Sequence, residues 1–215
     1  MGLIPTLGAR LAQYTFAPEL LVTDGEATLI APNGDVPGGD AADGTPEGWL
    51  PYRDVLRLVA TGRRHVMMGA AQIDRYGNQN ISCIGDWARP KAQLLGVRGA
   101  PGNTVNHAVS YWVPRHSRRV FVEHVDMVCG VGFDRGAPDL RVVVTNLAVL
   151  DFLTPDHAMR LRSVHPGVEL AEVLNETGFE LVVPDDVPKT RVPSIAELDL
   201  IRRLDPDEAR EKEVP

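Results

Sequence analysis

The stretch that most constrains the fold runs from Gly69 to Asn106, where short apolar runs alternate with glycine-containing turns. It begins within the apolar run His65–Ala71, whose length suits a buried strand better than a helix. Gly77 and Asn78 come next, and both residue types accept a positive φ at a turn. Two further strands are predicted in this stretch, Ile81–Ile84 and Ala92–Val97.

The segment Gly96–Asn103 is rich in glycine, with Gly96, Gly99 and Gly102 recurring at every third residue and Arg98 between them. Glycines let a backbone approach a ligand closely, and exposed N–H groups can face an anion or a developing oxyanion. A guanidinium there can hold a carboxylate or phosphate with two hydrogen bonds. A structural turn with one surface charge fits the same pattern, so the segment alone leaves both interpretations open.

Size and charge narrow the class of protein. With 215 residues and no long structureless linker, residues 1–215 are predicted to form a single domain. The net charge of −7, with both signs interspersed, argues against a nucleic-acid or polybasic membrane partner. We find no run of about 18 apolar residues and no signal-peptide pattern, which predicts a cytoplasmic protein. Cys83 and Cys129 form no CxxC motif and are expected to be reduced.

Apolar periodicity predicts an α/β fold with an open mixed sheet flanked by helices. Helices are predicted at Ile4–Tyr14, Tyr52–Ala60, Glu169–Glu176 and Ser194–Leu204. Ser194 and Glu197 form a capping-box pattern, and Gly178 stands where a C-cap is expected. Strands are predicted at Leu20–Val22, Ala108–Val113, Arg119–Val125, Arg141–Thr145, Leu147–Phe152, Met159–Val164 and Phe179–Val183.

Two segments are predicted to lack regular structure. Residues 33–48 are rich in Gly, Asp and Pro, which indicates a mobile surface loop. Residues 205–215 form a charged tail that is expected to fray.

The six histidines do not predict a metal site. His107, His116 and His124 are nine and eight residues apart, which is not the i, i+4 or i, i+2 spacing of zinc ligands. His107 follows Asn106 near the glycine-rich segment, so it either lines a pocket or is a hydrogen-bonded core histidine.

Several motifs occur in an order that resembles the β subunit of glutaconate-type coenzyme A transferases. They are Phe16–Pro18, Gly69–Asp74, Tyr76–Asn78, Ile84–Asp86, Pro90–Lys91, Gly96–Asn103 and Asn175–Glu180. The resemblance covers nearly the whole chain. It implies the open α/β fold of that family, an acyl-CoA substrate and an active site between two related subunits.

A more detailed likeness is to the β subunits of the steroid ring-cleaving hydrolases of cholesterol-degrading bacteria. It is carried by Thr23–Glu26, Glu47–Trp49, Gly62–His65, Arg75–Ser82, Val97–Asn103, Asn106–Ala108, Ser110–Trp112, Pro155–His157 and His165–Gly167. This resemblance implies hydrolytic, retro-Claisen-like cleavage of a carbon–carbon bond in a cyclic keto acyl-CoA. It also implies an α-subunit partner in an α2β2 complex, a catalytic glutamate on that partner, and no cofactor, since CoA is part of the substrate.

The chain departs from the transferases at their nucleophile. Those enzymes carry a catalytic glutamate in an E-S-G tripeptide, and the aligned residues here are Thr23, Asp24 and Gly25. A hydroxyl cannot replace the carboxylate that carries CoA through an anhydride and a thioester. Asp24 is one residue away, which on a strand turns a side chain to the opposite face, and Glu26 lies beyond Gly25.

Three functional classes therefore remain, and the hydrolase subunit is favoured. The second is a true CoA-transferase subunit that uses Asp24 or Glu26, and the third is a free-standing ligand-binding domain. Asp24 and Glu26 are the only catalytic candidates in this chain, and a solvated turn explains them equally well. Substrate and CoA binding is predicted at Gln72, Gly96, Arg98, Gly99, Ala100, Gly102, Asn103 and Asn106.

Overall fold

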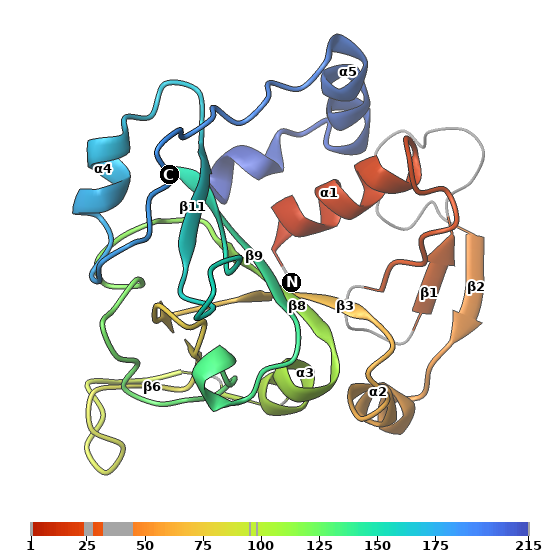
Figure 1. Cartoon of the computed structure of the whole chain (residues 1–215). Coiled ribbons are helices and arrows are strands. Elements are labelled where there is room, and N and C mark those ends of the chain that lie inside the picture. Colours follow the sequence, from red (N-terminus) through yellow and green to blue (C-terminus); the bar gives the residue numbers. More distant parts are fainter. Residues whose placement is uncertain (1, 24–27, 32–44, 95, 98, 215) are drawn as a thin grey trace. The chain divides into compact units, whose positions relative to one another are not determined.

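The computed structural model describes residues 2–23, 28–31, 45–94, 96–97 and 99–214. The chain divides into two compact units (Figure 1), the first made of Met1–Arg57 and Val192–Pro215 and the second of Leu58–Arg191. The prediction of a single domain concerns how these units are joined, and it stays a prediction. No helix in the described ranges is long and apolar enough to cross a membrane.

The first unit is mainly helical. Its helices are α1 (Leu3–Gln13), α5 (Ile195–Leu204) and the 3-10 turn η2 (Ala209–Lys212), and α1 packs against both of the others. The predicted capping box is confirmed, because Ser194 Oγ accepts from Glu197 N and the Glu197 carboxylate accepts from Ser194 N. Two antiparallel strands complete the unit, β1 (Thr28–Ala31) and β2 (Thr45–Trp49). Helix α2 (Tyr52–Val59), also predicted, spans the division.

Both segments that were predicted to be irregular need correction. The loop predicted at 33–48 ends early, because residues from Thr45 onward form β2, while residues 32–44 lie outside the described ranges. The prediction that residues 205–215 fray is also wrong. Asp205 is buried, accepts from the Ala209 and Arg210 amides at 3.0 Å each, and pairs with the Arg210 guanidinium. Glu213 accepts from the Ile4 amide, so the tail is tied to α1.

The second unit contains a five-stranded mixed sheet. Its order is β11 (Arg160–Val164), β10 (Ala148–Asp151), β9 (Leu140–Thr145), β8 (Ala108–Val113) and β3 (His65–Gly69). Strands β3, β8 and β9 run parallel, and β9, β10 and β11 are antiparallel. The helices of this unit are α3 (Ala100–Asn106) and α4 (Leu170–Asn175). The predicted open mixed sheet is confirmed.

Apolar side chains of this sheet and of the segments on it form the main core. Five of the six residues of β8 are buried, as expected for a central strand with parallel neighbours. The β9–β10 hairpin forms where it was predicted, and Thr145 Oγ1 accepts from the Leu147 and Ala148 amides in its turn. The largest core side chains are Ile73, Tyr111, Phe121, Leu150, Phe152, Met159 and Leu161.

Three predicted strands are wrong. Arg119–Val125 and Phe179–Val183 contribute only isolated bridges, at Phe121 to Ile73 and at Val182 to Arg160. Leu20–Val22 is not a buried strand, since Leu20 and Leu21 are exposed. The first two apolar runs bury side chains and make one bridge each but no ladder of strand pairs, which periodicity cannot distinguish from a short strand.

Gly178 is not the predicted C-cap, since the C-cap of α4 is Glu176. It is absent from the glycines with positive φ, and a Cβ there would collide with the Phe121 carbonyl oxygen. Glycine is required because two backbones pass closely, not because a helix ends there.

Short hairpins follow β3. Strand β4 (Gln72–Ile73) pairs with β5 (Gln79–Asn80), and β6 (Cys83–Ile84) pairs with β7 (Ala92–Gln93). The strands predicted at 81–84 and 92–97 are thus present but shorter. Residues 133–135 form the 3-10 turn η1.

His116 is a buried histidine of this core. Its ring stacks on Phe121 with centroids 3.9 Å apart, and its nitrogens lie 3.2 Å and 3.0 Å from the hydroxyls of Thr145 and Thr177. Burial lowers the pKa of His116 from 6.5 to about 4. Between pH 6.5 and about 4, His116 is protonated in the unfolded chain but neutral in the folded chain. The free energy of unfolding therefore decreases as the pH falls through this range.

We therefore expect the wild-type chain to lose stability, on the order of 3 kcal/mol, as the pH falls from about 6.5 to 4 through His116 alone. The His116→Gln substitution removes this component and flattens the pH dependence. Chemical denaturation at several pH values measures the free energy of unfolding. Leu150→Ala is a suitable control, because a core cavity lowers stability equally at each pH. An unchanged slope in His116→Gln would contradict the assignment.

Candidate functional site

A network of buried amide side chains organises the segment that follows β3. Asn80, fully buried, donates to Gln72 Oε1 at 2.7 Å and to the Cys83 carbonyl at 2.6 Å. Its Oδ1 accepts from the Ser82 and Cys83 amides. The two hairpins are therefore joined through a single side chain, which satisfies backbone groups that no sheet reaches.

Gln72, a predicted binding residue, belongs to this network. Its Oε1 also accepts from the Asp126 amide at 2.9 Å, and its Nε2 donates to the Asp126 carboxylate at 3.0 Å. Asp126 in turn accepts from the Gly85 amide at 2.8 Å. The amide of Gln72 thus connects three segments of this chain, and its contact with a substrate stays a prediction.

The glycine-rich segment is partly helical. Gly96 has a φ of +102°, which favours glycine, and its amide donates to the Ile81 carbonyl. Gly99 is the N-cap of α3, which begins at Ala100. The predicted loop therefore ends at Gly99. Arg98 lies outside the described residues, as do Asp24 and Glu26.

Three of the predicted binding residues hold α3 in place. A Cβ on Gly102 would collide with the Val59 side chain at the end of α2. Asn106 Nδ2 donates to the Val59 carbonyl at 3.1 Å, and Ala100 is buried. Close helix packing requires glycine at position 102, and its predicted role in ligand approach stays a prediction.

Asn103, a predicted binding residue, lies between Met68 of the sheet and Gly99. Its amide nitrogen lies 3.6 Å from Met68 Sδ on β3, and a Cβ on Gly99 would lie 3.3 Å from the same nitrogen. Its Oδ1 accepts from Arg64 Nη2 at 3.2 Å. Arg64 was not among the predicted site residues, because no local motif links it to Asn103, 39 positions away.

A second link to α3 was also missed from the sequence. The Thr104 hydroxyl accepts from the Val131 amide at 3.0 Å, and Asn78 Oδ1 accepts from the Gly132 amide at 2.8 Å. Added Cβ atoms on Gly130 and Gly132 would lie within 3.0 Å of Thr104 and Asn78 atoms, respectively. The turn at 130–132 therefore packs between the Asn78 turn and α3 and is hydrogen-bonded to both.

His107, at the end of α3, is only 2% exposed. The lowered pKa of His107 results first from burial and then from the charge of Arg64. The nearby carbonyls of Val59 and Leu58 favour its protonated form, yet neither ring nitrogen has a hydrogen-bond partner of normal geometry. The expected core histidine is thus buried but not hydrogen-bonded.

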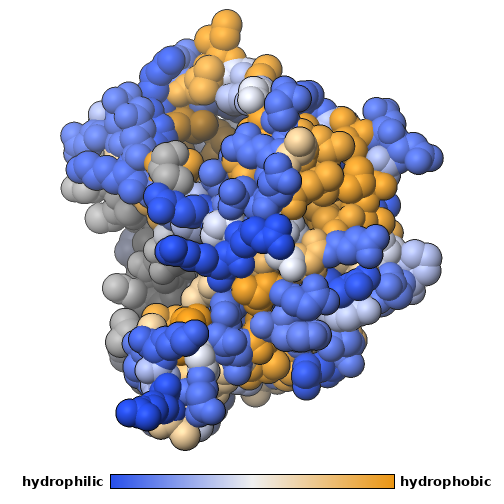
Figure 2. All heavy atoms as spheres, turned by 90° about the vertical axis from the view of Figure 1, so that its left-hand side faces the viewer, coloured by the Kyte–Doolittle hydropathy of each residue, from blue (hydrophilic) through white to orange (hydrophobic). Residues whose placement is uncertain are grey.

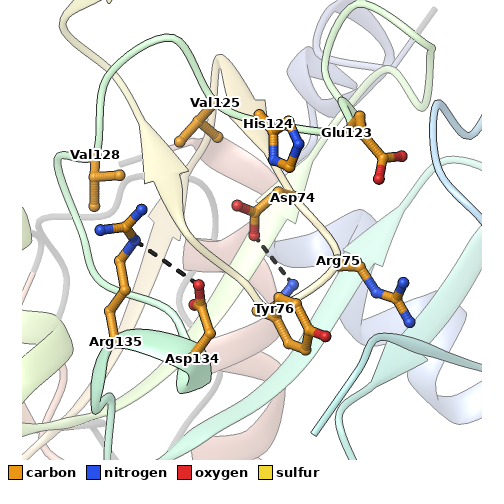
Figure 3. Close-up of a pocket in the computed structure, with 9 residues that line it drawn as sticks. All are labelled: Asp74, Arg75, Tyr76, Glu123, His124, Val125, Val128, Asp134 and Arg135. Carbon is orange, nitrogen blue, oxygen red and sulfur yellow. Dashed lines mark hydrogen bonds and ion pairs between the residues drawn. The ribbon is translucent and has the colours of Figure 1, made fainter. Parts of the chain in front are cut away.

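A small pocket of about 130 Å³ lies beside the Asp74–Asn78 turn (Figure 3) and was not predicted. Asn78 Nδ2 donates to both Asp74 and Asp134, at 2.9 Å and 2.8 Å. Burial raises the pKa of Asp74, and the charge of Asp134 adds to this effect against the hydrogen bonds from Asn78 and Tyr76. The wall consists of Asp74, Arg75, Tyr76, Glu123, His124, Val125, Val128, Asp134 and Arg135. No cluster of three or more metal-binding side chains occurs among the residues that the structure describes.

The model of the family "coenzyme A transferase" matches residues 56–176, more than half of the chain. The chain belongs to the coenzyme A transferase family. The matched residues include the buried amide network, the glycine-rich segment and α3, so the geometry described above is the family's part of this molecule.

Within the coenzyme A transferase family, the chain is more similar to some members than to others. It is 51% identical to the cholesterol ring-cleaving hydrolase IpdB subunit of Mycobacterium tuberculosis, over 97% of this chain and 87% of that protein. The crystal structure of Rhodococcus jostii IpdAB matches with a TM-score of 0.92 and 49% identity, covering 100% of this chain and 89% of that one. Glutaconate coenzyme A-transferase of Acidaminococcus fermentans matches with a TM-score of 0.83 and 25% identity, covering 96% and 86%.

The two glycines around α3 are expected to respond differently to substitution. Gly102→Ala forces a Cβ into Val59, and overpacking of this kind lowers the free energy of unfolding by about 1–3 kcal/mol. Gly99→Ala has room for its Cβ but presses on the Asn103 amide, so it should lower activity with little loss of stability. Thermal unfolding and turnover of both variants test this contrast. Equal losses of stability would show that Gly99 serves packing alone.

Proposed function

We propose that this chain is the β subunit of a hydrolase that opens a ring of a steroid-derived cyclic keto acyl-CoA. The observation that carries the proposal is 51% identity, over 97% of the chain, to a cholesterol ring-cleaving hydrolase subunit. The TM-score of 0.92 to the IpdAB structure supports the same interpretation, and it exceeds the 0.83 found for the transferase.

The residue at the transferase nucleophile position also favours hydrolysis. Thr23 stands where the transferases carry glutamate, and a threonine hydroxyl does not form the glutamyl-CoA thioester of their cycle. The alternative, a CoA-transferase that uses Asp24 or Glu26, is consequently less favoured.

The chemistry proposed is the reverse of a Claisen condensation. Water adds to the ring ketone, and the bond between that carbon and the carbon α to the thioester breaks. The electron pair passes to the α carbon and delocalises as an enolate onto the thioester oxygen, and a proton then completes the product. The former ketone carbon becomes a carboxylate. Backbone N–H groups of the glycine-rich segment are proposed to stabilise the enolate, for which one lost donor costs about 10²–10³ in rate.

The remaining parts of the site are assigned to a second subunit. We propose an α subunit, in an α2β2 complex, that supplies the general base for the attacking water. The related Rhodococcus jostii crystal structure supports a partner, because it is of IpdAB and not of the IpdB subunit by itself. The reaction as written needs no cofactor, and a cytoplasmic location suits a CoA-dependent pathway.

The surface of the chain is compatible with such a partner. Hydrophobic residues gather in patches on the face shown in Figure 2. Large apolar side chains that are more than 60% exposed include Phe16, Trp49, Trp87, Leu153 and Ile195. Apolar side chains of this size are typical of residues that a subunit interface covers.

The isolated chain is expected to be inactive, and the complex with its α subunit active. An obligate interface of this kind buries more than about 2,000 Å² in total. Light scattering gives the mass of each preparation, and release of the ring-opened acyl-CoA gives its turnover. Full activity of the isolated monomer would contradict the proposal.

A trapping experiment separates hydrolase from transferase. During turnover, borohydride or hydroxylamine captures any acyl or CoA ester of a carboxylate, and peptide mass spectrometry locates it. We expect no modification on this chain. A modified Asp24 or Glu26 would instead establish the transferase function.

A further inference from the structure

Arg64 is a partly buried arginine whose charge is not balanced by a carboxylate of the described residues. Arg160 and Arg210, which are also partly buried, each pair with a buried aspartate, at 2.9 Å and 3.0 Å. No described carboxylate pairs with Arg64, and its buried Nε has no hydrogen-bond partner. Holding an unpaired charge away from water costs free energy, so a position of this kind calls for a functional explanation.

A hydrogen bond connects Arg64 to the glycine-rich segment. Arg64 Nη2 donates to Asn103 Oδ1 at 3.2 Å, which orients the Asn103 amide so that its nitrogen faces Gly99 and Met68. The Asn103 backbone amide donates to the Gly99 carbonyl at 2.8 Å. Asn103 is 8% exposed, so a change in its side chain is transmitted to the N-cap of α3.

The charge of Arg64 also acts on His107, which follows α3. Strands β3 and β8 pair in parallel with His65 opposite Ala108, so Arg64 and His107 immediately precede paired residues, and the field of Arg64 contributes to keeping His107 uncharged. Because burial weakens screening by water, a partly buried guanidinium without a paired carboxylate raises the electrostatic potential around it. Asn103, and through it the N-cap of α3 at Gly99, therefore lies near a positive charge that no carboxylate of the described residues neutralises.

We propose that Arg64 is a positioning residue for the ring-opening reaction. It fixes Asn103 behind Gly99 and raises the electrostatic potential at the N-terminal end of α3, which favours the enolate anion of the acyl-CoA over the neutral ketone. This inference rests on the proposed function. It adds a group that acts through Asn103 and through its charge, without touching the substrate.

Three variants of this chain, each assembled with the α subunit, test the proposal. Arg64→Gln keeps a hydrogen-bond donor but removes the charge, and should lower kcat about tenfold or more while KM changes little. Arg64→Lys keeps the charge and should recover a measurable part of kcat. The neighbouring Arg63 is exposed, so Arg63→Gln makes the same change in net charge and should match the wild type.

A second measurement does not depend on turnover. The pKa of His107, followed by NMR, should rise in Arg64→Gln and stay at its wild-type value in Arg63→Gln. A wild-type kcat in Arg64→Gln would overturn the proposal. So would an Arg64→Lys complex as slow as Arg64→Gln, because the charge would then be irrelevant.

The two hypotheses fail in distinguishable ways. If the wild-type complex opens no cyclic keto acyl-CoA, the proposed function is wrong, and the His107 titration alone decides whether Arg64 raises the potential at α3. If the wild type is active and Arg64→Gln equals it, only the role of Arg64 is wrong.

Discussion

The structure of the second unit depends on how backbone polar groups are satisfied where the sheet stops. After β3 the chain makes two hairpins of only two residues per strand, too short to pair all of their own N–H and C=O groups. Buried amide side chains complete the pairing. Asn78, Gln79 and Asn80 are each no more than 1% exposed, and each bonds to backbone of another segment.

This constraint also explains where glycine and small side chains are needed. The turn at 130–132 fits between Asn78 and Thr104 only without Cβ atoms at its two glycines. Gly102 allows α3 to approach the end of α2 in the same way. Helix α3 is thus held by packing and hydrogen bonds within this chain, which is the arrangement expected of a preorganised site.

Local signals predicted the elements whose stability is local. The capping box at Ser194, the β9–β10 hairpin and the buried strand β8 each follow from a few neighbouring residues. Short apolar runs such as Arg119–Val125 gave wrong strand predictions, because a buried segment that makes only one bridge has the same composition as a strand. The charged tail was predicted to fray because of its composition, but Asp205 and Arg210 form a partly buried ion pair within it.

Motifs could indicate where the candidate site lies, but they could not predict its contacts. They identified the family correctly, and the glycine-rich segment as its binding site stays a prediction. Contacts such as Arg64 to Asn103, or Gln72 to Asp126, join residues 39 and 54 positions apart with no periodicity to reveal them. Gly102 is a further example, because its close packing against Val59 has no signature in the sequence, and its contact with a ligand stays a prediction.

The central claim is that this chain belongs to a hydrolase and not to an enzyme that transfers CoA. Turnover of a cyclic keto acyl-CoA by the complex in ¹⁸O-labelled water tests it most directly. We expect one ¹⁸O atom in the new carboxylate of a ring-opened product whose CoA thioester is intact. Transfer of CoA to an added carboxylic acid, with the ring unopened and no ¹⁸O in a new carboxylate, would contradict it.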